Sequence, residues 1–252
     1  MINLKTKDWT INNVETILFD KDGTFIDLHY FWGKMTELRA KETVQHFCLP
    51  DHTVHSLCKY LGYNTQTKKM EPDGITALYS RSQIIELYKN DLKNLNITTT
   101  NTQIEKIFDK VSQEFYKDMT IYTKPIESAI NFIKEIKQQG IKTGIVTSDA
   151  KESTDLTLKN FGWENLFDIV IGRESSPHTK ESGIPTIMAL KELQANPKTT
   201  VMIGDAPMDY ISAKNAEINN VILVATGQIE KNELFKTNNY VLDSLDKITI
   251  FP

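Results

Sequence analysis

The sequence predicts an α/β fold, in which a parallel sheet flanked by helices is interrupted by a helical insertion. From about residue 125 onward, short apolar runs alternate with amphipathic helical patterns, and this alternation is typical of parallel sheets. A further apolar run at residues 16–19 stands far ahead of the others. We therefore expect a core domain formed by residues 1–27 and 123–252, and a small α-helical cap domain formed by residues 28–122.

The first expected strand lies ahead of the helical insertion in the chain. Residues 16–19 form a continuous apolar run that ends at Asp20, and Gly23 follows in a polar loop. No convincing strand pattern follows from residue 29 to about residue 122, where the apolar spacing is helical. The positions that show this spacing include Phe31, Met35, Leu38, Ile104, Ile107, Val111 and Phe115.

The second part of the core begins with a helix, after which strands and helices are expected to alternate. Pro125 stands where a helix could begin, and Gly140 stands where it could end. Further helices are expected near residues 151–160 and from Pro185. The expected strands lie at residues 141–147, 167–171, 201–203 and 221–225. In open sheets of this kind, ligands bind at the carboxyl ends of the strands, so we expect the functional residues directly after the strands.

Composition excludes several classes of protein. The 252 residues carry 29 Lys and Arg against 33 Asp and Glu, and no long basic block suggests a nucleic-acid partner. The only cysteines, Cys48 and Cys58, are expected to be packed thiols in a reducing compartment. No apolar run has the length of a signal-peptide core or a membrane span, so we expect a cytoplasmic protein without a membrane partner. The oligomeric state stays open.

The first group of polar residues is Asp20-Lys21-Asp22-Gly23-Thr24, directly after the first strand. One carboxylate could attack phosphorus, and the other could handle the proton of the leaving group. Gly23 allows the backbone to turn sharply. The alternative is an acidic turn without chemistry, which is common at surfaces.

The second group is Gly204-Asp205-Ala206-Pro207-Met208-Asp209, again after an apolar run. Together with Asp20, its two carboxylates would suit Mg²⁺, which prefers carboxylates, waters and phosphate oxygens. Asp209 could also simply cap the helix that follows.

Two further segments are weaker candidates for the functional site. Thr147-Ser148-Asp149 follows the expected strand at residues 141–147, and its hydroxyls and amides could hold phosphate oxygens. Lys180 precedes a helix, where a fixed ammonium could neutralise both a nucleophile and a phosphate. Taken alone, a single lysine is most often merely solvated.

In this order and on these strand ends, the four segments resemble the haloacid dehalogenase superfamily. The helical block after the first segment looks like the small α-helical cap of its phosphoglycolate phosphatase and β-phosphoglucomutase groups, so the chain resembles a phosphoglycolate phosphatase-like hydrolase with an inserted cap. That resemblance implies a Rossmann-like core and makes Asp20 the nucleophile and Asp22 the general acid and base. Glu217 departs from the pattern, since many relatives have glycine there. The implied catalytic residues are Asp20, Asp22, Thr147 and Lys180, the implied substrate-binding residues are Gly23, Thr24 and Ser148, and the implied metal residues are Asp20, Asp22 (through its backbone carbonyl), Asp205 and Asp209.

Within the superfamily, the presence of Asp22 favours a phosphatase, because an alkoxide leaving group needs a proton. The resemblance implies a Mg²⁺-dependent hydrolase of a small phosphorylated metabolite, such as phosphoglycolate or a sugar phosphate. A β-phosphoglucomutase-like phosphoryl transfer and a non-catalytic phosphate sensor are the alternatives. Candidate substrate contacts in the cap are Trp32, Tyr63, Lys68, Lys69 and Arg81, and a polar helix start explains His52 and His55 better than a metal site does.

Overall fold

The computed structural model describes all residues, 1–252, and the chain divides into two compact units. The first consists of Met1–Asp27 with Lys124–Pro252, and the second is Leu28–Thr123.

The first unit is built on a six-stranded parallel sheet with the order β10-β9-β8-β3-β6-β7. This confirms the predicted α/β fold class. The expected strands are present with ends shifted by a few residues. The strands are β3 (Thr16–Phe19), β6 (Lys142–Val146), β7 (Ile169–Ile171), β8 (Thr200–Gly204), β9 (Asn220–Val224) and β10 (Val241–Leu242).

The strand order reverses between β3 and β8, and this reversal fixes where a ligand can bind. The chain runs outward from β3 to β6 and β7, returns to β8 on the other side of β3, and continues outward to β9 and β10. In doubly wound sheets the connecting loops diverge at such a point and leave a crevice at the carboxyl ends of the strands. Phe19 of β3 pairs with Ile203 of β8, so the residues that follow these two strands are neighbours.

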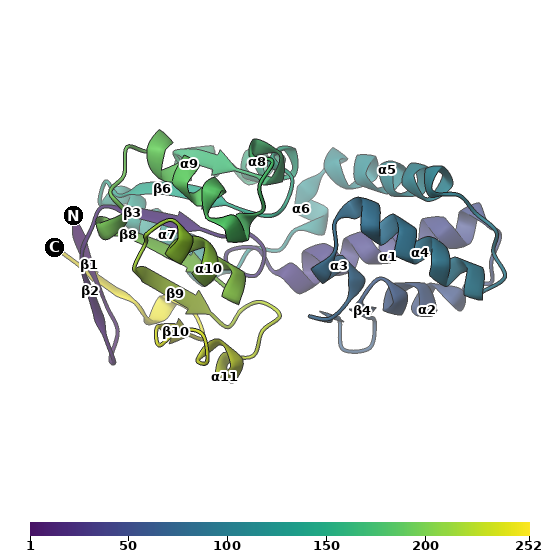
Figure 1. Ribbon diagram of the computed structural model, residues 1–252, viewed down its shortest axis with the longest axis horizontal. Coiled ribbons are helices and arrows are strands. Elements are labelled where there is room, and N and C mark those ends of the chain that lie inside the picture. The colour runs from purple at the N-terminus through teal and green to yellow at the C-terminus, as the bar shows by residue number, and fades with distance from the viewer. The chain divides into compact units, whose positions relative to one another are not determined.

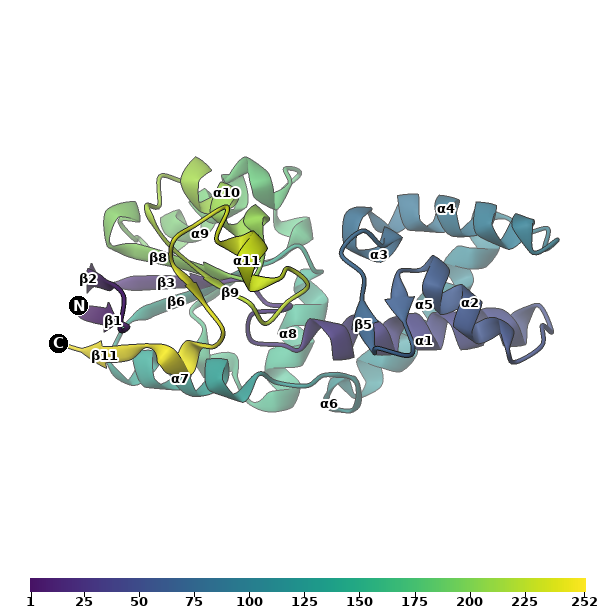
Figure 2. The same cartoon turned by 90° about the horizontal axis from the view of Figure 1, so that it is seen from below.

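Helices cover both faces of the sheet (Figures 1 and 2). In Figure 2, α7 and α8 lie on one face, and α9 and α10 lie on the other. Phe132 of α7 meets Phe19 edge-on, and Leu190 of α9 packs in a cluster with Leu18 and Met202. The helices are α7 (Glu127–Gln138), α8 (Lys151–Phe161), α9 (Ile184–Glu192), α10 (Pro207–Asn215) and α11 (Lys231–Leu234), and 3-10 turns lie at Glu164–Leu166, Arg173–Ser175, Lys180–Ser182, Pro197–Thr199 and Leu245–Lys247.

A second, antiparallel sheet in this unit has no counterpart in the sequence-based expectation. Its order is β11-β1-β2, and it joins the two ends of the chain. Its strands are β1 (Ile2–Lys5), β2 (Thr10–Val14) and β11 (Thr249–Phe251). Ile2 and Leu4 are buried and alternate with more exposed residues, the period-two pattern of a strand with one covered face.

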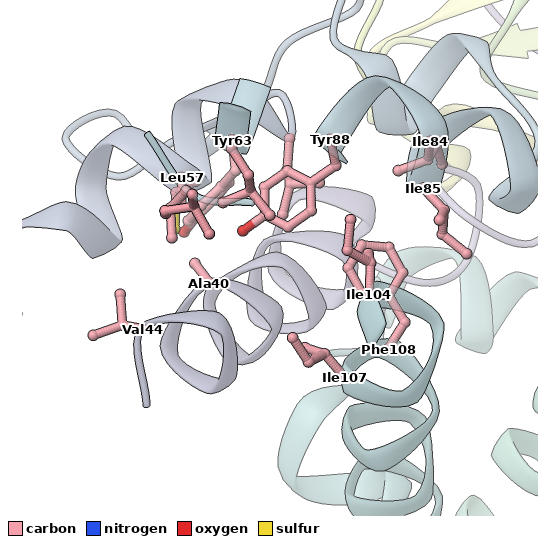
Figure 3. Packing of buried hydrophobic residues seen from close by; sticks show 14 of the residues in the cluster. Ala40, Val44, Leu57, Tyr63, Ile84, Ile85, Tyr88, Ile104, Ile107 and Phe108 are labelled. Atoms are coloured by element: carbon pink, nitrogen blue, oxygen red, sulfur yellow. The ribbon is translucent and has the colours of Figure 1, made fainter. Parts of the chain in front are cut away.

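The second unit is helical and has its own core (Figure 3). A two-stranded hairpin of β4 (Tyr63–Asn64) and β5 (Lys69–Met70) interrupts the helices, which corrects the expectation that residues 28–122 contain no strand. The helices are α1 (Leu28–His46), α2 (Thr53–Tyr60), α3 (Ile75–Leu78), α4 (Arg81–Asn94), α5 (Asn101–Lys117) and α6 (Met119–Tyr122). Figure 3 shows Ala40, Leu57, Tyr88 and Phe108 directed toward a shared interior, which explains how so small a unit buries its apolar faces.

Both cysteines are free thiols, Cys58 being buried and Cys48 exposed, so the expectation of a packed thiol is wrong for Cys48. No helix is both long and apolar enough to span a membrane.

Candidate active site

The carboxyl ends of β3 and β8 bring Asp20 and Asp205 together. Asp20 is the first residue after β3, and its amide donates a hydrogen bond of 2.8 Å to the carbonyl of Ile203 in β8. Asp205 is the first residue after β8. Both side chains are buried at the point where the strand order reverses.

Lys180 lies buried between two of these carboxylates. It begins the 3-10 turn Lys180–Ser182, and its Nζ atom lies 2.5 Å from Asp20 Oδ1 and 2.6 Å from Asp209 Oδ1. Burial alone would lower the pKa of the Lys180 amine, but Asp20 and Asp209 outweigh burial and raise it above its ordinary value. The amine is therefore a fixed positive charge at neutral pH.

Three carboxylates meet around this ammonium. Oxygens of Asp20, Asp205 and Asp209 lie within 4.8 Å of one another. Burial, together with repulsion from Asp209 and Asp22, raises the pKa of Asp20 to about 7 although Lys180 opposes the shift. Burial and the neighbouring carboxylates also raise the pKa of Asp205 well above its ordinary value. A buried cluster of this kind is unfavourable without further positive charge, and hard oxygen ligands are what Mg²⁺ prefers.

Asp209 supports the cluster from the first turn of α10. Its Oδ1 pairs with Lys180, and its Oδ2 accepts a hydrogen bond of 3.0 Å from the amide of Ala206. Asp209 thus ties the first turn of α10 to the acidic cluster, and the metal role expected for it stays a prediction. Because its two oxygens contact Lys180 and Ala206, Asp209 holds the Lys180 ammonium at a fixed place beside Asp20.

Two glycines make room for the Asp205 carboxylate. A Cβ atom at Gly23 or at Gly227 would collide with the side chain of Asp205. Gly23 also has φ +88°, a backbone conformation that favours glycine. The loops are tied together by Thr226, whose Oγ1 donates a hydrogen bond of 2.5 Å to the carbonyl of Gly23. Sequence reasoning missed Thr226 and Gly227, because only their contacts across loops reveal their part.

Asp22 lies beside a second, fully buried lysine. Lys21 Nζ is 2.8 Å from Asp22 Oδ1 and 2.8 Å from Asp149 Oδ2. Burial would raise the pKa of Asp149, but Lys21 holds it below its ordinary value. No periodicity or spacing in the sequence distinguishes Lys21 from a solvated lysine, so only the structure reveals that it is buried and paired.

The remaining predicted residues line the same loops. Thr147 follows β6, is buried, and accepts a hydrogen bond of 3.1 Å from the amide of Asp149 at its Oγ1. Ser148 is exposed, and its hydroxyl points to the sulfur of Met208 at 3.5 Å. Thr24 is buried, and the amide of Gly23 donates to the carbonyl of Ile26. The substrate contacts predicted for Gly23, Thr24 and Ser148 stay predictions.

Two of the residues suggested for substrate contact in the helical unit have local partners, and the substrate contacts suggested for all five stay predictions. Arg81 pairs with Asp109 at 2.6 Å, and Tyr63 is buried against Gly33. His55 hydrogen-bonds Thr65. The group of possible metal ligands in this structure is formed by Asp20, Asp205 and Asp209.

A parallel sheet with a buried carboxylate and lysine cluster at its switch point is the architecture of an α/β enzyme. The family model described as haloacid dehalogenase-like hydrolase matches residues 17–224. The chain belongs to this family of hydrolases, which confirms the superfamily expected from the motifs.

Individual relatives are distant but cover nearly the whole chain. Pyrophosphatase PpaX of Bacillus mycoides is 25% identical over 93% of this chain and 95% of its own. The structure of a predicted phosphoglycolate phosphatase from Haemophilus somnus has a TM-score of 0.68 at 17% identity, with 94% of this chain and 96% of that one covered. The proposed beta-phosphoglucomutase of Thermotoga maritima has a TM-score of 0.70 at 15% identity, with 93% and 96% covered. At these identities, the structural likeness shows the shared fold.

Proposed function

We propose that the chain is a Mg²⁺-dependent phosphatase that hydrolyses a small phosphorylated metabolite through an aspartyl phosphate on Asp20. The observation that carries this proposal is the contact of Lys180 with Asp20 within the buried cluster of three aspartates. A carboxylate at a strand end, fixed by an ammonium and beside a cation site, is arranged to accept a phosphoryl group. The name of the PpaX relative, a pyrophosphatase, supports phosphoryl chemistry.

The donor set fits Mg²⁺. The carboxylates of Asp20 and Asp205, with the backbone carbonyl of Asp22, would hold the ion, and Asp209 would support it through Lys180. The absence of side chains at Gly23 and Gly227 leaves Asp205 the space to face this position. When bound, the ion would neutralise charge on the phosphoryl oxygens.

The residues divide the reaction into two steps. In the first, a carboxylate oxygen of Asp20 bonds to phosphorus while the bond from phosphorus to the leaving oxygen breaks, and Asp22 gives that oxygen a proton. In the second, Asp22 takes a proton from water, which attacks phosphorus and frees Asp20 and inorganic phosphate. Asp22 is therefore protonated again at the end of the cycle. Lys180 and the hydroxyl of Thr147 would hold the phosphoryl oxygens throughout.

The helical unit Leu28–Thr123 is proposed to act as the cap that reads the rest of the substrate. Its insertion directly after the loop that carries Asp20 and Asp22 supports this role. A cap that closes over a small substrate excludes bulk water and strengthens the charged contacts inside. We therefore expect phosphorylated metabolites or pyrophosphate as substrates, and not folded phosphoproteins.

The experiment is a measurement of phosphate release from phosphoglycolate, several sugar phosphates, nucleotides and pyrophosphate, with Mg²⁺ and with EDTA. We expect release from one or a few compounds that depends on the metal and is absent in the Asp20→Asn variant. Phosphate release that persists in EDTA or in the Asp20→Asn variant would contradict the mechanism. No release from any compound of the panel would contradict the proposed activity.

A further inference from the structure

The buried side chain of Lys21 connects two loops of the site. Lys21 stands between Asp20 and Asp22 in sequence, and its ammonium lies 2.8 Å from the carboxylate of Asp22 and 2.8 Å from that of Asp149. Asp149 belongs to the loop after β6, which also carries Thr147. The lysine therefore ties the loop of the proposed acid and base to the loop of the proposed phosphate contacts.

Asp149 is itself held rigidly. Its Oδ1 accepts a hydrogen bond of 2.7 Å from the amide of Ala150, and its carbonyl accepts one of 2.9 Å from the amide of Arg173. Its own amide donates to the hydroxyl of Thr147 at 3.1 Å. A lysine anchored on such a residue has little freedom, so the carboxylate that it holds is fixed as well.

Lys21 is also fixed by its own backbone. Its carbonyl accepts amide hydrogen bonds from Phe25 at 3.1 Å and Ile26 at 3.1 Å, which close the turn after Asp22. A fully buried lysine is costly unless its charge is paired, and a purely structural turn does not require one. An apolar side chain would fill this space at a lower cost in desolvation, so the charge itself calls for a functional explanation.

We propose that Lys21 is a positioning residue, which holds the Asp22 carboxylate in the orientation needed for proton transfer and is itself anchored on Asp149. This inference rests on the proposed function and adds to it a residue that acts through Asp22. Proton transfer depends on hydrogen-bond reach, and a displacement of about 1 Å can cost roughly 10²-fold in rate. Removal of Lys21 should therefore impair the steps that use Asp22 more than those that do not.

The test compares two esters that differ in their need for a proton. The leaving group of p-nitrophenyl phosphate departs without protonation, whereas that of an alkyl phosphate needs it. For the Lys21→Met variant with Mg²⁺, we expect kcat/KM to fall by about 10- to 100-fold for the alkyl phosphate and by less than about 3-fold for p-nitrophenyl phosphate. In an Asp22→Asn background, the same substitution should add less than about 2-fold.

Two further variants guard against a simple loss of folding. Asp149→Asn keeps Lys21 but weakens its anchor, so the same selective loss is expected at smaller size. Lys137→Met is the matched control, because Lys137 pairs with Asp168 at 2.6 Å in the same unit outside the site, and neither ester should be affected. Thermal unfolding and circular dichroism establish that each variant is folded. If Lys21→Met does not fold, Asp149→Asn carries the comparison.

Equal losses on both esters, or full additivity with Asp22→Asn, would assign Lys21 a structural part and overturn the inference while the phosphatase activity stands. A wild-type enzyme that releases phosphate from neither ester and from no compound of the metabolite panel would overturn the proposed function and this inference together.

Discussion

Replacement of Lys180 by methionine is the sharpest perturbation of the site, because one side chain balances several buried charges. The substitution keeps the length of the side chain and removes the ammonium that contacts Asp20 at 2.5 Å and Asp209 at 2.6 Å. Asp20, Asp205 and Asp209 then share a buried site without a protein cation. We expect a loss of both stability and activity.

The size of the loss of stability follows from these contacts. At an effective dielectric constant of about 20, unit charges about 2.5 Å apart attract by roughly 6–7 kcal/mol before desolvation is subtracted. Removal of one partner from a buried pair typically costs about 3–5 kcal/mol, because the other charge is left uncompensated. For a protein of this size that corresponds to a fall in Tm of roughly 6–20 °C.

The stability lost in the Lys180→Met variant should increase as the pH rises. The pKa of Asp20 is raised to about 7 even with Lys180 beside it, because burial disfavours its charge. At pH 5.5, Asp20 is largely protonated in the folded protein, so the loss of Lys180 costs less there than at higher pH, although Asp209 still loses its partner. As pH rises through about 7, Asp20 must ionise beside two other carboxylates, and the free-energy difference between wild type and variant grows by up to about 1.4 kcal/mol for each unit by which the variant's pKa exceeds that of the wild type.

Urea unfolding of the wild type and of Lys180→Met in EDTA, at pH 5.5 and at pH 8, measures this difference. The same titration with Mg²⁺ should recover more stability in the variant than in the wild type, since the ion replaces the missing charge. A loss below about 1 kcal/mol at pH 8, or a loss that is larger at pH 5.5, would refute the electrostatic account of the cluster.

Three other predictions test neighbouring parts of the structure. Asp20→Asn should lower kcat by at least about 10³-fold in a phosphate-release assay and leave the circular dichroism spectrum unchanged, because it removes the nucleophile's charge and little volume. Gly227→Ala should weaken Mg²⁺ binding by more than about 10-fold by calorimetry, since its methyl group would collide with the carboxylate of Asp205; unaltered affinity would place the metal elsewhere. Glu217→Gly should raise Tm by about 2–4 °C at unchanged kcat, because Glu217 has φ +61°, and a side chain in that conformation costs about 1 kcal/mol; a lower Tm would contradict this.

The parallel sheet and the motifs at its strand ends could be predicted from the sequence. Buried parallel strands such as Thr200–Gly204 are continuous apolar runs, and Asp20 and Asp205 come directly after such runs. The antiparallel sheet was not predicted because Ile2–Lys5 is short and pairs with Thr249–Phe251 at the other end of the chain. The roles of Lys21 and Gly227 were not predicted for a similar reason, since they depend on contacts with Asp149 and Asp205 in distant segments.

The two buried lysines divide the charges of the site in a way that bears on the order of binding. Around Lys180, three carboxylates oppose one ammonium, which leaves a net charge of about −2 when all are ionised. Around Lys21, the carboxylates of Asp22 and Asp149 oppose one ammonium, so that group lies closer to neutral. An anionic phosphate is repelled by the first group until a divalent cation balances it, whereas the second group needs no ion to keep its carboxylates paired. The arrangement therefore favours a sequence in which the metal binds before the phosphate, with the proposed acid and base already held in place.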